Sequence, residues 1–326
     1  MSVLEKNLQK RKREARKEGD NELLVATCTN LSDVYMESGR FQLAIKEYKV
    51  LARLYKAKHK YIDYAGANRA IGEAHLELKK FKTALAYHKR YLDTVKSENH
   101  NVEIQRAYAS IGHVYLTEYL ETQSDAEQNL NEAYSYFERS MRVCESFSLV
   151  NKLEKADMQA RLFSNLGLVK ELLGDFTKAI EFYIKSKNIC KENHIYEQLI
   201  SNYMSLAALY EKKKEMDKTI HYYNLAVEAI KNPKGVNITL ACTALQAKAE
   251  VLIKLNDFHA AKKLIFRAHK LRTSEDIIRN LRIVATICDK QTKILKNDSR
   301  KMGKRRNNNN LNERAMIQSL VIISKF

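Results

Sequence analysis

In residues 165–183, apolar side chains recur at helical spacing as far as Leu173, stop at Gly174 and resume at Ala179. A spacing of three to four residues places the apolar side chains of each half on one helix face. A glycine followed by a polar residue between two such patterns is typical of a tight turn. The stretch therefore predicts two antiparallel helices that pack through their apolar faces.

A small residue recurs in the first helix of each predicted hairpin, 40 residues apart wherever no insertion intervenes. These residues are Ser32, Gly72, Gly112, Gly167, Ala207 and Ala249. The order Leu-Gly, Gly-x-Phe, Ala and an aromatic residue is the tetratricopeptide signature, whose minimal unit has about 34 residues. The pattern predicts an all-α fold: a right-handed superhelical solenoid of about six tetratricopeptide-type hairpins with a 40-residue period and a capping helix at each end.

Four segments are predicted along the chain. Residues 1–20 form a charged capping helix, and residues 21–272 form the solenoid. Its third repeat is enlarged over about 116–158, which predicts longer helix ends or a projecting loop. Residues 273–296 form the second capping helix, and residues 297–326 form a basic, asparagine-rich tail that is expected to be disordered.

The composition favours helices and an intracellular protein. Nine glycines and one proline in 326 residues are too few for a fold rich in loops. The five cysteines include no Cys-x-x-Cys pair, and we expect them to be reduced thiols. No apolar run is long enough for a signal peptide or a membrane span. The expected location is the nucleus, with the cytoplasm left open as a second compartment.

The chain is basic, with 57 Lys and Arg against 39 Asp and Glu, a net charge of +18. Part of the excess lies in Lys10–Arg13 and in Lys301–Arg306. Such clusters are either solvated surface or attract acidic partners, nucleic acid or an import receptor. Lys304, Arg305 and Arg306 form the candidate cluster for nuclear import or an acidic partner. Direct binding of nucleic acid is expected to be weak or absent.

Catalytic motifs are missing from the sequence. It contains no phosphate-binding loop, no His-Glu-x-x-His, no Gly-x-Ser-x-Gly and no dinucleotide fingerprint. His75 and His88 occupy repeat positions that usually hold aromatic residues, so they are expected in the core or at its rim. We expect no enzymatic activity, no cofactor and no metal.

The first helices of stacked hairpins are expected to line a concave groove. Thr29 and Asp33 belong to this register, and the candidate peptide-binding residues are Arg69, Glu73, Arg106, His113, Arg161, Asn165 and Asn202. Arginine pairs with carboxylates through two parallel hydrogen bonds, and asparagine can hold main-chain amides. The predicted partners are therefore proteins that present acidic or extended peptide segments.

Four motifs are similar to one particular group of repeat proteins. His100–Gly112, Arg161–Leu168, Glu192–Glu197 and Asp257–Lys263, together with the enlarged third repeat, resemble the N-terminal tetratricopeptide array of Tonsoku-like proteins. The resemblance covers the chain from its first helix to about Leu271.

The resemblance implies a nuclear scaffold that acts at replication forks in the repair of DNA double-strand breaks by homologous recombination. It also implies partners among replication-fork components, histones and histone chaperones. Family members continue into an acidic stretch, ankyrin repeats and leucine-rich repeats, which this sequence lacks. If the chain is complete, only contacts made by the tetratricopeptide array carry over; if it is a fragment, the full function belongs to the longer protein. The alternatives are a Pins-type spindle-orientation scaffold and a generic tetratricopeptide adaptor.

Overall fold

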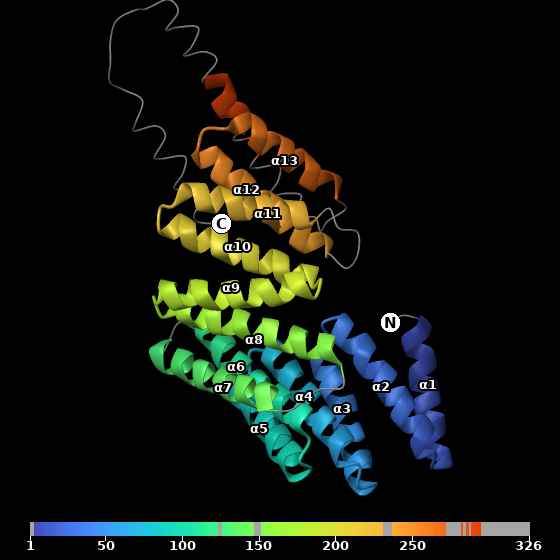
Figure 1. Cartoon of the computed structure of the whole chain (residues 1–326). Helices are drawn as coiled ribbons and strands as arrows, with labels where there is room; N and C mark the ends of the chain where they lie inside the picture. Colours follow the sequence, from blue (N-terminus) through green and yellow to red (C-terminus); the bar gives the residue numbers. More distant parts are fainter. Residues whose placement is uncertain are drawn as a thin grey trace, which may run out of the picture. The chain divides into compact units, whose positions relative to one another are not determined.

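The computed structural model describes residues 3–122, 126–146, 151–230 and 237–271, with a few residues between 282 and 294. All regular elements in these residues are α-helices (Figure 1). They are α1 (Val3–Glu18), α2 (Asn21–Glu37), α3 (Phe41–Ala57), α4 (Tyr61–Glu77), α5 (Phe81–Ser97), α6 (Asn101–Thr122), α7 (Ala126–Ser146), α8 (Lys152–Leu172), α9 (Phe176–Glu192), α10 (Tyr196–Lys212), α11 (Met216–Ala229), α12 (Ile238–Lys254) and α13 (Phe258–Lys270). The prediction of an all-α repeat fold is confirmed.

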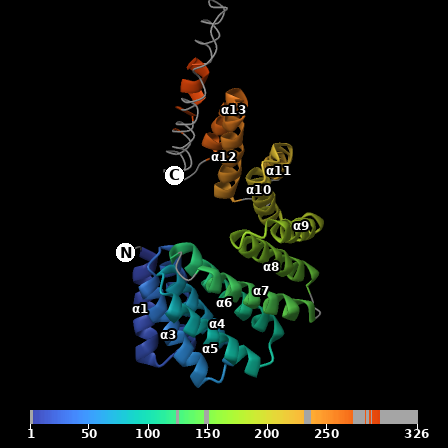
Figure 2. The same ribbon diagram turned by 90° about the vertical axis from the view of Figure 1, so that its left-hand side faces the viewer.

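The chain divides into two compact units, residues 1–186 and 187–326. In unit 1, successive helices from α1 to α8 pack against each other, and in unit 2 the same holds from α10 to α13 (Figure 2). None of the described helices is both long enough and apolar enough to cross a bilayer. The expected capping helix over 273–296 lies mostly outside the described residues, and the tail over 297–326 lies wholly outside them.

The 40-residue period comes from two helices of equal length. Helices α2, α3, α4 and α5 each have 17 residues, and three residues separate each from the next helix. The middle residue of these turns has a positive φ, 68° at Gly39 and 55° at both His59 and Lys79. At the first turn, the N–H of Gly39 donates to the carbonyl of Met36, and the N–H of Arg40 donates to that of Tyr35. This pair of bonds is the Schellman motif, which satisfies carbonyls at the end of a helix.

The small residues of the first helices allow a ring of the second helix to approach closely. A methyl group at Gly72, Gly112 or Gly167 would lie 2.8 Å from His88, 2.9 Å from Phe137 or 3.0 Å from Tyr183, respectively. Real Cβ contacts are essentially never shorter than 3.0 Å, so the close approach of the ring selects glycine at positions 72 and 112, and at Gly167 the ring of Tyr183 would have to shift slightly. The signature in the sequence therefore reports direct contact between the helices of a hairpin.

The enlarged third repeat contains longer helices. Its helices α6 and α7 have 22 and 21 residues, compared with 17 in the preceding hairpins, and α8, the first helix of the next hairpin, has 21. Of the two predicted alternatives, the longer helix ends are present. The linking residues 123–125 and 147–150 lie outside the described residues.

Helix α1 covers the apolar end of the first hairpin. It buries Glu5, Leu8 and Ala15. The guanidinium of Arg40 donates to both carboxylate oxygens of Glu5, at 3.0 and 2.9 Å. An ion pair with these two hydrogen bonds fixes the orientation of the helix as well as its position.

Candidate functional site: a pocket lined by α4, α6 and α8

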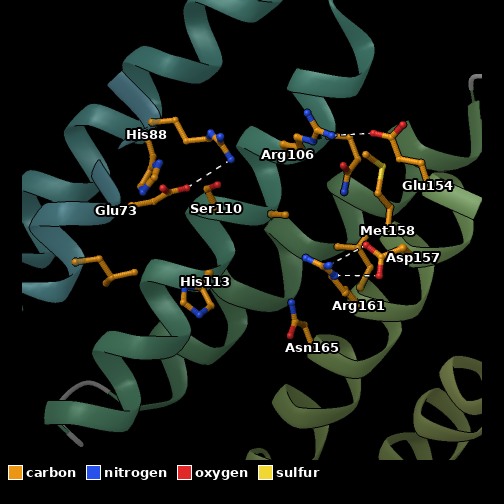
Figure 3. A pocket seen from close by; sticks show the side chains of 15 residues that line it. Glu73, His88, Arg106, Ser110, His113, Glu154, Asp157, Met158, Arg161 and Asn165 are labelled. Atoms are coloured by element: carbon orange, nitrogen blue, oxygen red, sulfur yellow. Dashed lines mark hydrogen bonds and ion pairs between the residues drawn. The ribbon is translucent and has the colours of Figure 1, made fainter. Parts of the chain in front are cut away.

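Unit 1 contains a pocket of about 450 Å³ whose walls are the exposed faces of α4, α6 and α8, with one residue from α5 (Figure 3). It is lined by Arg69, Glu73, Leu76, His88, Gln105, Arg106, Ala109, Ser110, His113, Glu154, Asp157, Met158, Arg161, Leu162 and Asn165. These helices are the first members of three successive hairpins. The pocket is therefore a groove across the repeats, because each hairpin presents the same helix face to it.

Six of the seven candidate binding residues line this pocket. They are Arg69, Glu73, Arg106, His113, Arg161 and Asn165. Residues almost 100 positions apart in the sequence meet here because the repeats stack in register. Their role in binding stays a prediction.

Asn202 is elsewhere, and the expectation that it faces a groove is wrong. It lies on α10 in unit 2 and is 1% exposed. Its amide nitrogen lies 3.8 Å from the sulfur of Cys190. Its side chain is part of the packing inside unit 2, where a ligand has no access to it.

The sequence-based selection missed several lining residues. Glu154, Asp157 and Met158 lie on α8, one to two turns before Arg161, and Gln105 lies beside Arg106 on α6. The selection took only residues near the small-residue position. Met158, Asp157 and Glu154 lie three, four and seven positions before Arg161. The helical period therefore places them on the same face of α8 as this arginine.

Each arginine of the pocket has a carboxylate partner within the pocket. Arg106 reaches Glu154 on the neighbouring first helix at 2.8 Å. Arg161 pairs with Asp157 at 2.9 Å, as Figure 3 shows for both pairs. Arg69 lies 3.6 Å from Glu73, the remaining carboxylate of the pocket lining. Three cations and three carboxylates balance, so net charge does not favour an acidic ligand over a basic one.

Arg106 also holds a half-buried carboxylate, that of Glu103 on its own helix. It donates to Glu103, which in addition accepts a hydrogen bond from the hydroxyl of Tyr91. Burial opposes the ionisation of Glu103, but the Tyr91 hydrogen bond and the charge of Arg106 outweigh it and lower the pKa of the carboxyl. Arg106 is thus positioned by carboxylates of both α6 and α8.

The inner wall of the pocket carries buried polar atoms that have no partner among the described residues. They are Nε of Arg69, Nδ1 of His88 and Oε1 of Gln105. His88 is 1% exposed, and burial together with the charge of Arg69 lowers its pKa to about 4, so the ring is neutral at pH 7.

The amide of Gln105 has a fixed orientation. The hydroxyl of Ser140 donates to the main-chain oxygen of Gln105 at 2.8 Å, so it must accept from the side-chain nitrogen at 2.9 Å. The acceptor Oε1 is then left over. These unpaired donors and acceptors are themselves buried, so the main chain of an extended peptide, which offers both, reaches them only after the side chains that cover them move.

Metal binding has no visible basis in the described part of the chain. No three His, Cys, Asp or Glu side chains come together there as a metal-ion site. The five cysteines are all buried and reduced.

Comparison with known proteins supports the repeat assignment. The tetratricopeptide repeat family matches residues 25–57, 160–193 and 200–233, which correspond to the hairpins α2–α3, α8–α9 and α10–α11. The chain is 33% identical over 298 residues to a protein of Drosophila melanogaster and 29% identical over 268 residues to one of Mus musculus. Both are named Tonsoku-like protein. The resemblance predicted from the sequence is confirmed.

These matches cover 87% and 82% of this chain but only 21% and 19% of the two relatives. The chain thus spans about a fifth of the length of the Tonsoku-like proteins that it matches. The similarity concerns the repeat array, and the remaining four fifths of those proteins have no counterpart in the match.

Solved structures resemble the fold. RapI in its apo form aligns with a TM-score of 0.62 over 92% of this chain and 84% of its own, at 16% identity. Aspartyl phosphate phosphatase F from Bacillus subtilis aligns with a TM-score of 0.59 over 84% of this chain and 73% of its own, at 14% identity. At these identities the likeness concerns the helical repeat architecture alone.

Proposed function

We propose that this chain is a non-enzymatic protein-binding scaffold that works in the nucleus at replication forks, in the repair of DNA double-strand breaks by homologous recombination. The similarity to Tonsoku-like proteins over more than four fifths of the chain supports this proposal. A fold of stacked helical hairpins supports it as well, because such folds present long concave surfaces suited to binding. By the same resemblance, its partners are replication-fork components, histones and histone chaperones.

The pocket of α4, α6 and α8 is the proposed binding site for an extended peptide segment. The observation that carries this proposal is the convergence of charged, amide and unpaired buried polar groups from three helices in one groove of about 450 Å³. The peptide main chain pairs with the unpaired donors and acceptors once the side chains that cover these buried atoms move aside. Side chains of either sign find a partner in the paired arginines and carboxylates, so the segment is extended and of mixed charge.

The test is affinity capture from nuclear extract with quantitative mass spectrometry. A pocket variant carries Arg106→Gln and Arg161→Gln. A control variant carries Arg139→Gln and Arg142→Gln, which are exposed on α7, outside the pocket, and remove the same charge. We expect the wild type and the control to capture the same proteins and the pocket variant to lose most of them.

Equal capture by all three proteins would refute the binding role of the pocket. The nuclear role is tested separately, by imaging the tagged chain in dividing cells with and without replication stress. Enrichment in the nucleus under stress is the expected result. Accumulation at the cell cortex would refute the repair role and favour the spindle-orientation alternative.

A further inference from the structure

The first and second helices of the N-terminal hairpins carry opposite charge. Helices α2, α4 and α6 together hold nine Asp and Glu but only two Arg. Helices α1, α3 and α5 hold 15 Lys and Arg and five Asp and Glu, a net charge of +10. The separation ends after α6, because α7 holds four Glu and two Arg.

Nearly all of these cations are exposed, whereas two of the five acids are withdrawn from the surface. Glu5 is 2% and Glu47 is 8% exposed, and they pair with Arg40 and with Lys12, the single half-buried cation of the three helices. The exposed cations form what we call the basic face. Its members are Lys6, Lys10, Arg11, Arg13, Arg16, Lys17, Lys46, Lys49, Arg53, Lys56, Lys82, Lys89, Arg90 and Lys96.

The helices of the basic face lie in one layer. Leu8 of α1 belongs to the same apolar cluster as Ala44 of α3, and Ile45 of α3 packs in a cluster with Tyr87 of α5. In Figure 2 the labels of α1, α3 and α5 follow one another along one side of unit 1, with α4 and α6 on the other side. The pocket is lined almost wholly by first helices, so it and the basic face belong to different layers.

Within each helix the cations form stripes. Lys6, Lys10, Arg13 and Lys17 are spaced by four, three and four residues, which places them on one line of α1. At a rise of 1.5 Å per residue, such a stripe is about 16 Å long, with a cation every ~5 Å. Residues 46–56 of α3 repeat the arrangement with four more cations. A nucleic-acid duplex carries one phosphate per about 3.4 Å of axis on each strand, so each stripe can follow a run of phosphates.

The chemistry of the face favours a duplex over other anionic partners. Binding of single strands relies on aromatic side chains on which bases stack, but no aromatic residue of α1, α3 or α5 is exposed. A protein partner needs apolar anchors at the centre of its interface, and the large exposed apolar residues of these helices are Val3 and Leu4, at the start of α1.

We propose that the basic face binds double-stranded nucleic acid through its phosphates, without reading the base sequence. The expectation from the sequence was weak or absent binding of nucleic acid, because the side chains of the predicted groove are of mixed charge. Helix α1 shares an apolar cluster and the Lys12–Glu47 pair with α3, and α3 shares a cluster with α5, so Lys10–Arg13 adjoin a larger surface. The proposal does not depend on the peptide site, which lies in the other layer.

The test uses fluorescence anisotropy with labelled duplexes of DNA and of RNA, each about 20 base pairs long, titrated with the full chain between about 50 and 200 mM salt. The face variant carries Lys46→Gln, Lys49→Gln, Arg53→Gln and Lys56→Gln. The matched control carries Lys191→Gln, Lys214→Gln, Lys263→Gln and Lys270→Gln, which are exposed in unit 2 and remove the same charge. Circular dichroism confirms that all three proteins are folded to the same extent.

We expect binding that weakens steeply with salt. The face variant should bind at least about tenfold more weakly at low salt, and its log–log salt slope should be flatter by up to about 3.6, at about 0.9 for each phosphate that is no longer neutralised. The affinity of the control should fall less than about threefold, because its substitutions change only the net charge of the chain. Comparison of the two Kd values shows whether the basic face prefers duplex DNA or duplex RNA.

Three results would overturn the proposal. The first is absence of binding to either duplex at the lowest salt concentration. The second is an equal loss of affinity in the face variant and the control, which would attribute binding to net charge alone, or no loss of affinity in the face variant, which would attribute binding to another segment. The third is displacement of the duplex by polyglutamate of equal charge at the same concentration, which would identify a dock for acidic proteins.

Discussion

The contact between Gly112 and Phe137 offers a direct test of how the hairpins are held together. A methyl group at Gly112 would lie 2.9 Å from Cε1 of Phe137, 3.0 Å from Cδ1 and 3.2 Å from the main-chain oxygen of Ala133. Phe137 is fully buried, at 0% exposure, so its ring has little room to move away. The perturbations are Gly112→Ala, Phe137→Ala and the double variant.

The magnitudes follow from packing. Overpacking by one methyl group costs about 1–3 kcal/mol, while replacing a helical glycine by alanine returns about 1 kcal/mol. Gly112→Ala should therefore lower the free energy of unfolding by about 1 kcal/mol. Phe137→Ala should lower it by about 3–5 kcal/mol, because it removes a buried ring and leaves a cavity. Once the ring is gone, the methyl group keeps only its 3.2 Å approach to the main-chain oxygen of Ala133, and Gly112→Ala becomes neutral or stabilising.

The assay is urea unfolding followed by circular dichroism, with hydrogen exchange of the α6 and α7 amides to locate the change. We expect a coupling energy of about 2 kcal/mol between the two substitutions, with the sign that makes the double variant more stable than additivity predicts. Gly66, where a methyl group would meet nothing within 4 Å, supplies the control: Gly66→Ala should not couple with Phe137→Ala. Coupling below about 0.5 kcal/mol for Gly112 would show that the close approach is not what selects glycine.

Two further predictions concern a titration and a helix cap. Burial and the charge of Arg69 lower the pKa of His88 to about 4, against about 6.5 in the unfolded chain, so unfolding takes up a proton between these values. The free energy of unfolding should therefore rise with pH across this window and level off above it. Urea unfolding of His88→Phe as a function of pH should show a weaker rise. An unchanged pH dependence in this variant would contradict the lowered pKa of His88. Asp20 accepts hydrogen bonds from the main-chain N–H groups of Glu22 and Leu23, so Asp20→Ala should lower the unfolding free energy by about 1 kcal/mol and Asp20→Asn by much less. Equal losses in the two variants, measured by urea unfolding, would exclude the cap as the cause.

The turns illustrate a limit of reading local signals. The glycines Gly39 and Gly174 mark two turns in the sequence, and both have a positive φ, as such glycines favour. His59, Lys79 and Asn99 adopt the same left-handed conformation, although lysine is not among the residues that favour it. The packing of the helices on either side imposes that conformation, and the one available signal is the spacing of 20 residues.

The sequence by itself determined the helices, their pairing and the repeat length. Local helix propensity and the 3.6-residue apolar period depend only on neighbours along the chain. The glycines at positions 72 and 112 reflect the contact between the two helices of a single hairpin. Because stacked repeats present equivalent positions, the sequence also placed Arg69, Arg106 and Arg161 on the face that lines the pocket.

Only the tertiary structure decided which side chains meet across hairpins. It paired Arg106 with Glu154, 48 positions away, and so balanced a groove whose arginines suggested an acidic ligand. It also gathered α1, α3 and α5 into one basic layer. Charge and burial depend on the distance between helices that are far apart in the chain, and the repeat pattern fixes which residues face outward without fixing what lies opposite them.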